Sequence, residues 1–192
     1  MREALIVIRR EHRSLAAVLH ALKFVCDEIA VGRMKPDFKL LWAMLHYIDA
    51  FPERLHHPKE DRYLFAALHK RTTEAAPALE RLEREHKECP ALINRLIGEL
   101  LRYKNDPSQG IADFAKEAER FSDFHWRHMR VEEDIIIPLA EKALAEEDWR
   151  SIDQAFQDNS DPLIGLESQK EFDKLFTRIV NLAPAPIGVG AR

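Results

Sequence analysis

The chain has 192 residues, a formal net charge of −4, 46% hydrophobic residues and 32% charged residues, which suits one globular domain with or without an appendage. The negative charge gives no reason to expect a nucleic-acid partner, and no apolar run reaches the roughly 18 residues of a membrane span. Two cysteines do not form a disulfide scaffold, so we expect a cytoplasmic protein.

Helix is favoured over sheet, because the chain has only six glycines and is rich in Ala, Leu, Glu, Lys and Arg. The first predicted helix runs from about Glu3 to Val31, with apolar residues at alternating spacings of three and four. Such a stripe packs against partner helices in a bundle. One polar residue, His12, interrupts the stripe, and Gly32 follows it as helix-ending glycines do.

The second predicted helix begins after Pro36, with Asp37 as its N-cap. Its segment from Phe51 to Leu68 contains two adjacent histidines and a carboxylate pair within an otherwise apolar, helix-forming run. Pro52 and Pro58 are expected to kink this helix, since each removes a backbone donor and crowds the preceding turn.

Two histidine–acid pairs in this segment have the spacing of a helical metal site. His56 and Glu60 lie on one face, and His57 and Asp61 form the same pair one residue further round. Each pair offers an imidazole nitrogen and a carboxylate, which suit a first-row transition metal. The stripe from Ile48 to Glu60 advances in steps of four, which suits an unwound or kinked helix. The helical wheel therefore does not decide which pair faces inward.

The third predicted helix covers about Thr73 to Tyr103, and again a single histidine, His86, lies in its apolar stripe. The fourth predicted helix covers about Ile111 to Ala145. Three consecutive inward positions of the fourth helix carry possible metal ligands: His125, His128 and Glu132.

Four amphipathic helices of about thirty residues, joined by short turns, predict an all-α, up-down-up-down four-helix bundle over residues 1–145. The pattern weakens after this point. Residues 146–182 are expected to form a short C-terminal helical extension, with helices near 148–156 and 168–182. Residues 183–192 are expected to be a disordered tail.

The shared inward position of these histidines and carboxylates indicates a metal site. Burying two carboxylates among neutral side chains costs several kcal/mol unless a cation compensates them. A nitrogen-rich set suits iron, copper, zinc or nickel, whereas calcium and magnesium prefer oxygen alone. Carboxylates from two different helices are placed to bridge two metals. A di-iron centre is the leading interpretation, with zinc or a single metal as the alternative.

Four short segments resemble the hemerythrin-like, or HHE cation-binding, family over about residues 3–145: EHR from Glu11, HHPKED from His56, REH from Arg84 and HMRVEEDIIIPLA from His128. This resemblance implies a four-helix bundle with an oxo- or hydroxo-bridged non-haem di-iron centre, histidines as terminal ligands and two carboxylates as bridges. By position, the implied ligands are His12, His56, Glu60, His86, His128 and Glu132.

The sequence departs from oxygen-carrying hemerythrins at two points. Their second helix-three histidine corresponds to residue 82, which is Leu82 here. Their helix-four carboxylate would correspond to Glu133, whereas the apolar stripe favours Glu132. Either His125 replaces the missing nitrogen, or one iron is left open to water, oxygen or a small ligand.

We therefore expect a non-enzymatic di-iron protein that binds O2 or a related diatomic molecule in sensing, storage or stress response. One alternative is an enzyme for peroxide or nitric oxide detoxification or iron–sulfur repair, which would use the open iron position with Tyr63 nearby. Another is an interaction module with a structural metal, in which the segment from Glu146 to Leu182 binds a partner or pairs two chains as a homodimer.

Overall fold

The computed structural model describes residues 2–107, 110–157 and 169–183, and every regular element within them is helical. The prediction of an all-α chain is confirmed. The long helices are α1 (Glu3–Ala30), α5 (Ala76–Asn105), α6 (Gly110–Val131) and a helical run that begins with α2 (Phe38–Ile48) and continues to residue 71. The shorter ones are α4 (Ala66–Arg71), α7 (Ile137–Ala143), α8 (Glu146–Gln157) and α9 (Gln169–Leu182).

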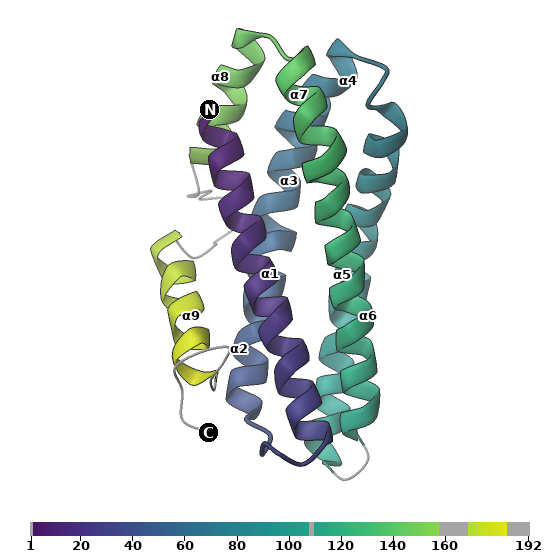
Figure 1. The fold of residues 1–192 in the computed structure, drawn as a ribbon, viewed down its shortest axis with the longest axis vertical. Helices are drawn as coiled ribbons and strands as arrows, with labels where there is room; N and C mark the ends of the chain where they lie inside the picture. Colours follow the sequence, from purple (N-terminus) through teal and green to yellow (C-terminus); the bar gives the residue numbers. More distant parts are fainter. Residues whose placement is uncertain (1, 108–109, 158–168, 184–192) are drawn as a thin grey trace.

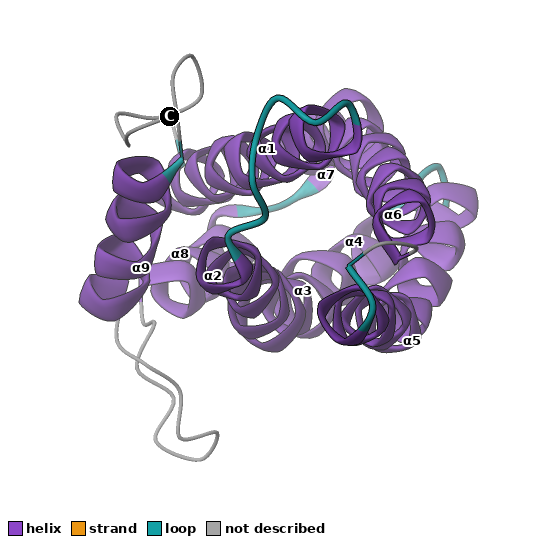
Figure 2. Cartoon of the chain, turned by 90° about the horizontal axis from the view of Figure 1, so that it is seen from below, coloured by secondary structure: helices purple, strands orange, loops and turns teal. Residues whose placement is uncertain are grey.

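The long helices form a bundle around a shared interior. α1 packs against α6 and α2, and α5 packs against the same two helices. Figure 1 shows α1 and α6 side by side along the long axis, and Figure 2 shows α1, α2, α5 and α6 around one interior. Side chains from every long helix therefore meet inside the bundle.

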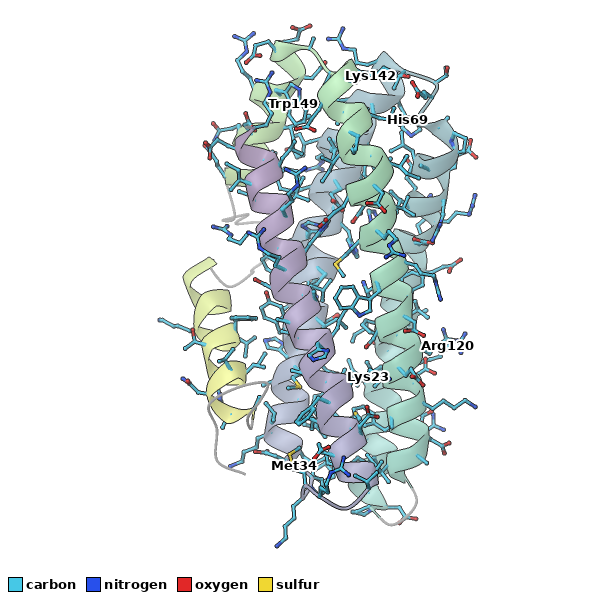
Figure 3. The ribbon with its side chains drawn as sticks, viewed as in Figure 1. Lys23, Met34, His69, Arg120, Lys142 and Trp149 are labelled. Carbon is cyan, nitrogen blue, oxygen red and sulfur yellow. The ribbon has the colours of Figure 1, made fainter. Side chains whose placement is uncertain are left out.

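The buried apolar side chains form two clusters, one toward each end of the bundle. The upper cluster includes Leu5, Leu79 and Trp149. Figure 3 labels Trp149 near the top of the molecule. The lower cluster includes Leu19 and Phe121. Along α1, buried apolar residues belong to the upper cluster as far as residue 8 and to the lower cluster from residue 15. The polar residues of the interior lie between these clusters.

Helix ends follow the local sequence. The Asp37 carboxylate accepts hydrogen bonds from the backbone N–H groups of Lys39 and Leu40, at 2.8 and 3.1 Å, so the predicted N-cap is confirmed. Gly32 follows α1 with φ of +75°, a conformation that costs glycine little. At the start of α6, a Cβ on Gly110 would meet the Tyr103 Cα at 2.3 Å. Glycine is therefore what lets α6 begin so close to α5.

The second predicted helix is interrupted by two π-helical segments, η1 (Asp49–His56) and η2 (Glu60–Phe65), with the single turn α3 (His57–Lys59) between them. A third segment, η3 (Glu132–Ile136), separates α6 from α7. A π-helix closes its hydrogen bonds from residue i to i+5, so its turn is wider than an α-helical turn. The wider turn explains the steps of four in the sequence, and it brings adjacent residues onto the inward face.

The residues after α7 pack on the bundle. α8 lies against α1 and η2, and α9 lies against α2 and α1. Ala183, the first residue of the predicted tail, is buried, and its N–H donates to the Ile179 carbonyl at 2.8 Å. The rest of that tail, 184–192, lies outside the described residues. So do residues 159–162, where the sequence NSDP predicts a turn. Within the part that the structure describes, no helix combines the length and apolarity needed to cross a membrane.

Candidate metal centre

A cluster of buried histidines and carboxylates lies between the two apolar clusters. The structure brings all six residues expected from the sequence into this cluster. Each is at most 7% exposed. The contributing elements are α1, the η1–η2 region, α5 and the α6–η3 junction. The six residues are His12, His56, Glu60, His86, His128 and Glu132.

The four histidines form two pairs. The Nε2 atoms of His12 and His56 are 3.2 Å apart, and we call this the first pair. The Nε2 atoms of His86 and His128 are 3.1 Å apart, and these form the second pair. All four rings therefore turn Nε2 toward the cluster interior.

Glu60 and Glu132 lie between the pairs and turn one oxygen toward each. Glu60 Oε1 is 3.2 Å from Nε2 of His56, and its Oε2 is 3.7 Å from Nε2 of His86. Glu132 Oε2 is 3.2 Å from Nε2 of His12, and its Oε1 is 3.0 Å from Nε2 of His128. Glu60 and Glu132, which we call the inner carboxylates, therefore each span both histidine pairs.

The two inner carboxylates fit a bound cation. Glu60 is fully buried and Glu132 is 1% exposed, yet none of their four oxygens accepts a hydrogen bond from a described residue. Such burial costs several kcal/mol for each ion unless a positive charge, on protonated histidines or on a metal ion, compensates it. Two groups have ligand atoms within 4.8 Å of one another and combine both carboxylates with one histidine pair: His12, His56, Glu60 and Glu132, and Glu60, His86, His128 and Glu132.

A second set of carboxylates contacts the outward nitrogens of the same histidines. The Nδ1 atoms lie 2.7 to 2.9 Å from these oxygens. An ionised carboxylate can only accept a hydrogen bond, so each Nδ1 carries a proton and donates it. When the ring is neutral, its lone pair is then on Nε2, the nitrogen that faces the cluster interior and can bind a metal. We call these four residues the outer carboxylates: Glu11 against His56, Asp61 against His86, Glu85 against His128 and Glu133 against His12.

The outer carboxylates connect the helices in a closed ring. Each is adjacent in sequence to one of the six clustered residues, and each bonds to the histidine of the next helix. A carboxylate on α1 bonds to a histidine on η1, and one on η2 bonds to a histidine on α5. A carboxylate on α5 bonds to a histidine on α6, and one on η3 bonds to a histidine on α1. The cluster is therefore oriented from all sides by hydrogen bonds between neighbouring helices.

In the metal-free protein, the pKa values of the clustered residues are set by burial and by the inner and outer carboxylates. Burial lowers the pKa of His128, but Glu132 and Glu85 outweigh it and raise the pKa to about 10. The pKa of His86 is raised to about 9, because Asp61 and Glu132 also outweigh burial there. Burial raises the pKa of Glu132, but His128 and His12 hold it well below its usual range. Protons on the histidines thus balance the inner carboxylates until a metal replaces them.

Residues that the sequence offered as alternatives occupy different places in the structure. Glu132 faces the cluster, whereas Glu133 is 44% exposed and bonds to His12 from outside. Asp61 does not compete with Glu60, because it bonds to the outer nitrogen of His86. Tyr63 packs against the upper cluster.

His57 and His125 are both buried near the cluster. The His57 ring stacks on His86, with centroids 4.2 Å apart and planes at 13°. Burial and His86 lower the pKa of His57 well below its usual value. The His125 ring lies 6.3 Å from that of His128, and burial lowers its pKa to about 3. The sequence offered His57 as a substitute for His56 and left open whether it joins the site. The steps of four were the signal that both histidines could face inward.

A cleft between α1 and α6 borders the cluster. Its volume is about 570 Å³, and His12, Glu133, Met129 and Trp126 are among the residues that line it. Trp126 is 47% exposed, so the cleft opens to solvent. The cleft thus borders the first pair at His12, beside the Glu133 carboxylate that bonds to Nδ1 of that ring.

The family model described as hemerythrin HHE cation-binding domain matches residues 4–140. The chain belongs to this family. A search of curated proteins found no match. The part that matches the hemerythrin model begins in α1, ends in α7 and contains all six clustered residues, whereas α8 and α9 lie beyond it. The resemblance inferred from the sequence is confirmed.

Proposed function

We propose that this hemerythrin-domain protein holds two iron ions between its histidine pairs, within an up-down-up-down four-helix bundle over residues 1–145. The observation that carries this proposal is the position of the two inner carboxylates. Glu60 and Glu132 each turn one oxygen toward each pair and accept no hydrogen bond from a described residue. In the proposed centre, His12 and His56 bind one iron, and His86 and His128 bind the other.

The donor set supports a first-row transition metal such as iron. Imidazole nitrogens with carboxylate oxygens suit iron, copper, zinc and nickel, and calcium or magnesium would take oxygen ligands alone. The outer carboxylates support the same assignment, because metal-bound histidines commonly donate their second N–H to a carboxylate. Zinc in both positions, or a single metal, is the alternative, and metal analysis with an optical spectrum separates it from di-iron.

We further propose that the centre binds O2 or a related diatomic ligand in sensing, storage or stress response, in a cytoplasmic setting. Iron supplies redox activity and coordination positions that the protein ligands do not fill. The cleft lined by His12 and Met129 supports access to the first pair. The apolar clusters lie toward the two ends of the bundle and keep bulk water from the centre along the bundle axis.

Anaerobic reconstitution with Fe(II), followed by metal analysis and an optical spectrum before and after exposure to O2, tests the proposal. We expect two iron ions per chain and charge-transfer absorption from an oxo or hydroxo bridge. Glu60→Ala should lose metal and the absorption, whereas the exposed control Glu88→Ala should keep both. One metal per chain without this absorption, or equal metal binding by the two variants, would refute the di-iron assignment.

A further inference from the structure

The turn α3 places a histidine beside the second pair that the six-residue set does not use. His57 is 4% exposed and directly follows His56 at the end of η1. Its ring centroid lies 4.2 Å from that of His86 and 5.2 Å from that of His128. The wider turns of η1 and η2 keep both adjacent histidines on the inward face of the bundle.

The nitrogens of these three rings converge. His57, His86 and His128 each offer one nitrogen, and these nitrogens lie within 4.8 Å of one another. Three imidazole nitrogens on one metal ion are a common donor set for first-row transition metals. Among the described residues, the convergent group that contains the first pair has no third histidine. The two halves of the centre are therefore unequal in nitrogen donors.

Two other positions are worse placed to supply this nitrogen. Leu82 is fully buried in the upper cluster and has no donor atom. His125 is equally buried, but its ring lies 6.2 Å from that of His57, and it belongs to none of the convergent groups within the described ranges. His57, rather than His125, therefore has the geometry of a ligand.

We propose that His57 is a third nitrogen ligand of the metal bound by His86 and His128. This inference depends on the proposed dinuclear centre and extends it. Because the second half then has three histidines and the first half two, with both inner carboxylates shared, the second half binds its metal more tightly and fills first. The half with fewer protein ligands is the one that borders the cleft at His12.

His57→Phe and the matched control His125→Phe test this inference, since each replaces a buried imidazole by an apolar ring. Co²⁺ titrations of the metal-free proteins, with chelator competition and visible spectra, give the affinity of each step. Wild type should bind two Co²⁺ in separable steps. His57→Phe should weaken the tighter step by more than about 10-fold, because even loss of an outer-shell partner typically weakens binding by about 10–100-fold. His125→Phe should retain both steps.

Unchanged affinities in His57→Phe, or equal losses in both variants, would overturn the role of His57 while leaving a dinuclear wild type intact. Wild type that binds only one Co²⁺ would instead refute the dinuclear centre itself. A measurement on wild type avoids any folding defect of the variants. In the Co²⁺-loaded protein, each metal-bound histidine should give one exchangeable, paramagnetically shifted N–H resonance. Five such resonances are expected with His57 as a ligand, and four would contradict it.

Discussion

Replacement of Glu11 by alanine removes the acceptor for Nδ1 of His56 and leaves both inner carboxylates in place. The Glu11 Oε2 atom lies 2.7 Å from that nitrogen, and both side chains are buried. A hydrogen bond to a charged group contributes roughly 1.5–3 kcal/mol. In the metal-free variant the His56 ring can turn to find another partner. With a metal on Nε2 the ring is fixed, so most of this energy appears as lost metal affinity.

Since about 1.4 kcal/mol corresponds to a tenfold change in binding, we expect Glu11→Ala to weaken metal binding by about 10–100-fold. Glu11→Gln keeps an acceptor oxygen without the charge and should fall between Glu11→Ala and wild type. Chelator competition with Co²⁺ measures the affinities, and the exposed control Glu88→Ala should match wild type. Affinity of Glu11→Ala within about twofold of wild type would refute an orienting role for the outer carboxylates.

Two further predictions concern stability. The folded-state pKa values of His86 and His128, about 9 and about 10, are raised above the ordinary 6.5. Their contribution to the metal-free protein is therefore fully present below about pH 6.5 and is lost as the pH rises through 9 and 10. Urea unfolding with chelator should show this decline, and a flat profile from pH 7 to 10 would contradict it. Gly110→Ala should destabilise by more than about 1 kcal/mol, because its Cβ would meet Tyr103 backbone, whereas Gly98→Ala, with nothing within 4 Å, should stabilise by about 0.5–1 kcal/mol. Equal thermal shifts in the two glycine variants would refute this comparison.

Helices and inward histidines were predictable because both follow from a local period. The spacing of three and four in α1 and α5 is enough to place His12 and His86 on the buried face. The caps at Gly32 and Asp37 depend on neighbouring residues only, so the end of α1 and the start of α2 were also predictable.

The angular position of residues in the second helix was not predictable, because it depends on where π-helical turns form. Those turns place the rings of His56 and His57 inside the bundle together. The role of Glu11 and Glu85 was missed for another reason. Each is adjacent to a clustered histidine and would be taken for a solvent-facing charge, but its partner belongs to another helix. Such contacts depend on the relative rotation of two helices, which a single sequence does not report.

The ring of outer carboxylates also fixes how far each helix can slide along its neighbours. Advancing one helix by a turn would displace it by about 5.4 Å and break a hydrogen bond on each of its two sides. Because the ring closes, no helix can shift without this double loss. The relative axial positions of the four helices are thus fixed by contacts that need no metal. The protein should therefore present a preformed cage to incoming ions, unlike small domains whose folding waits for the metal.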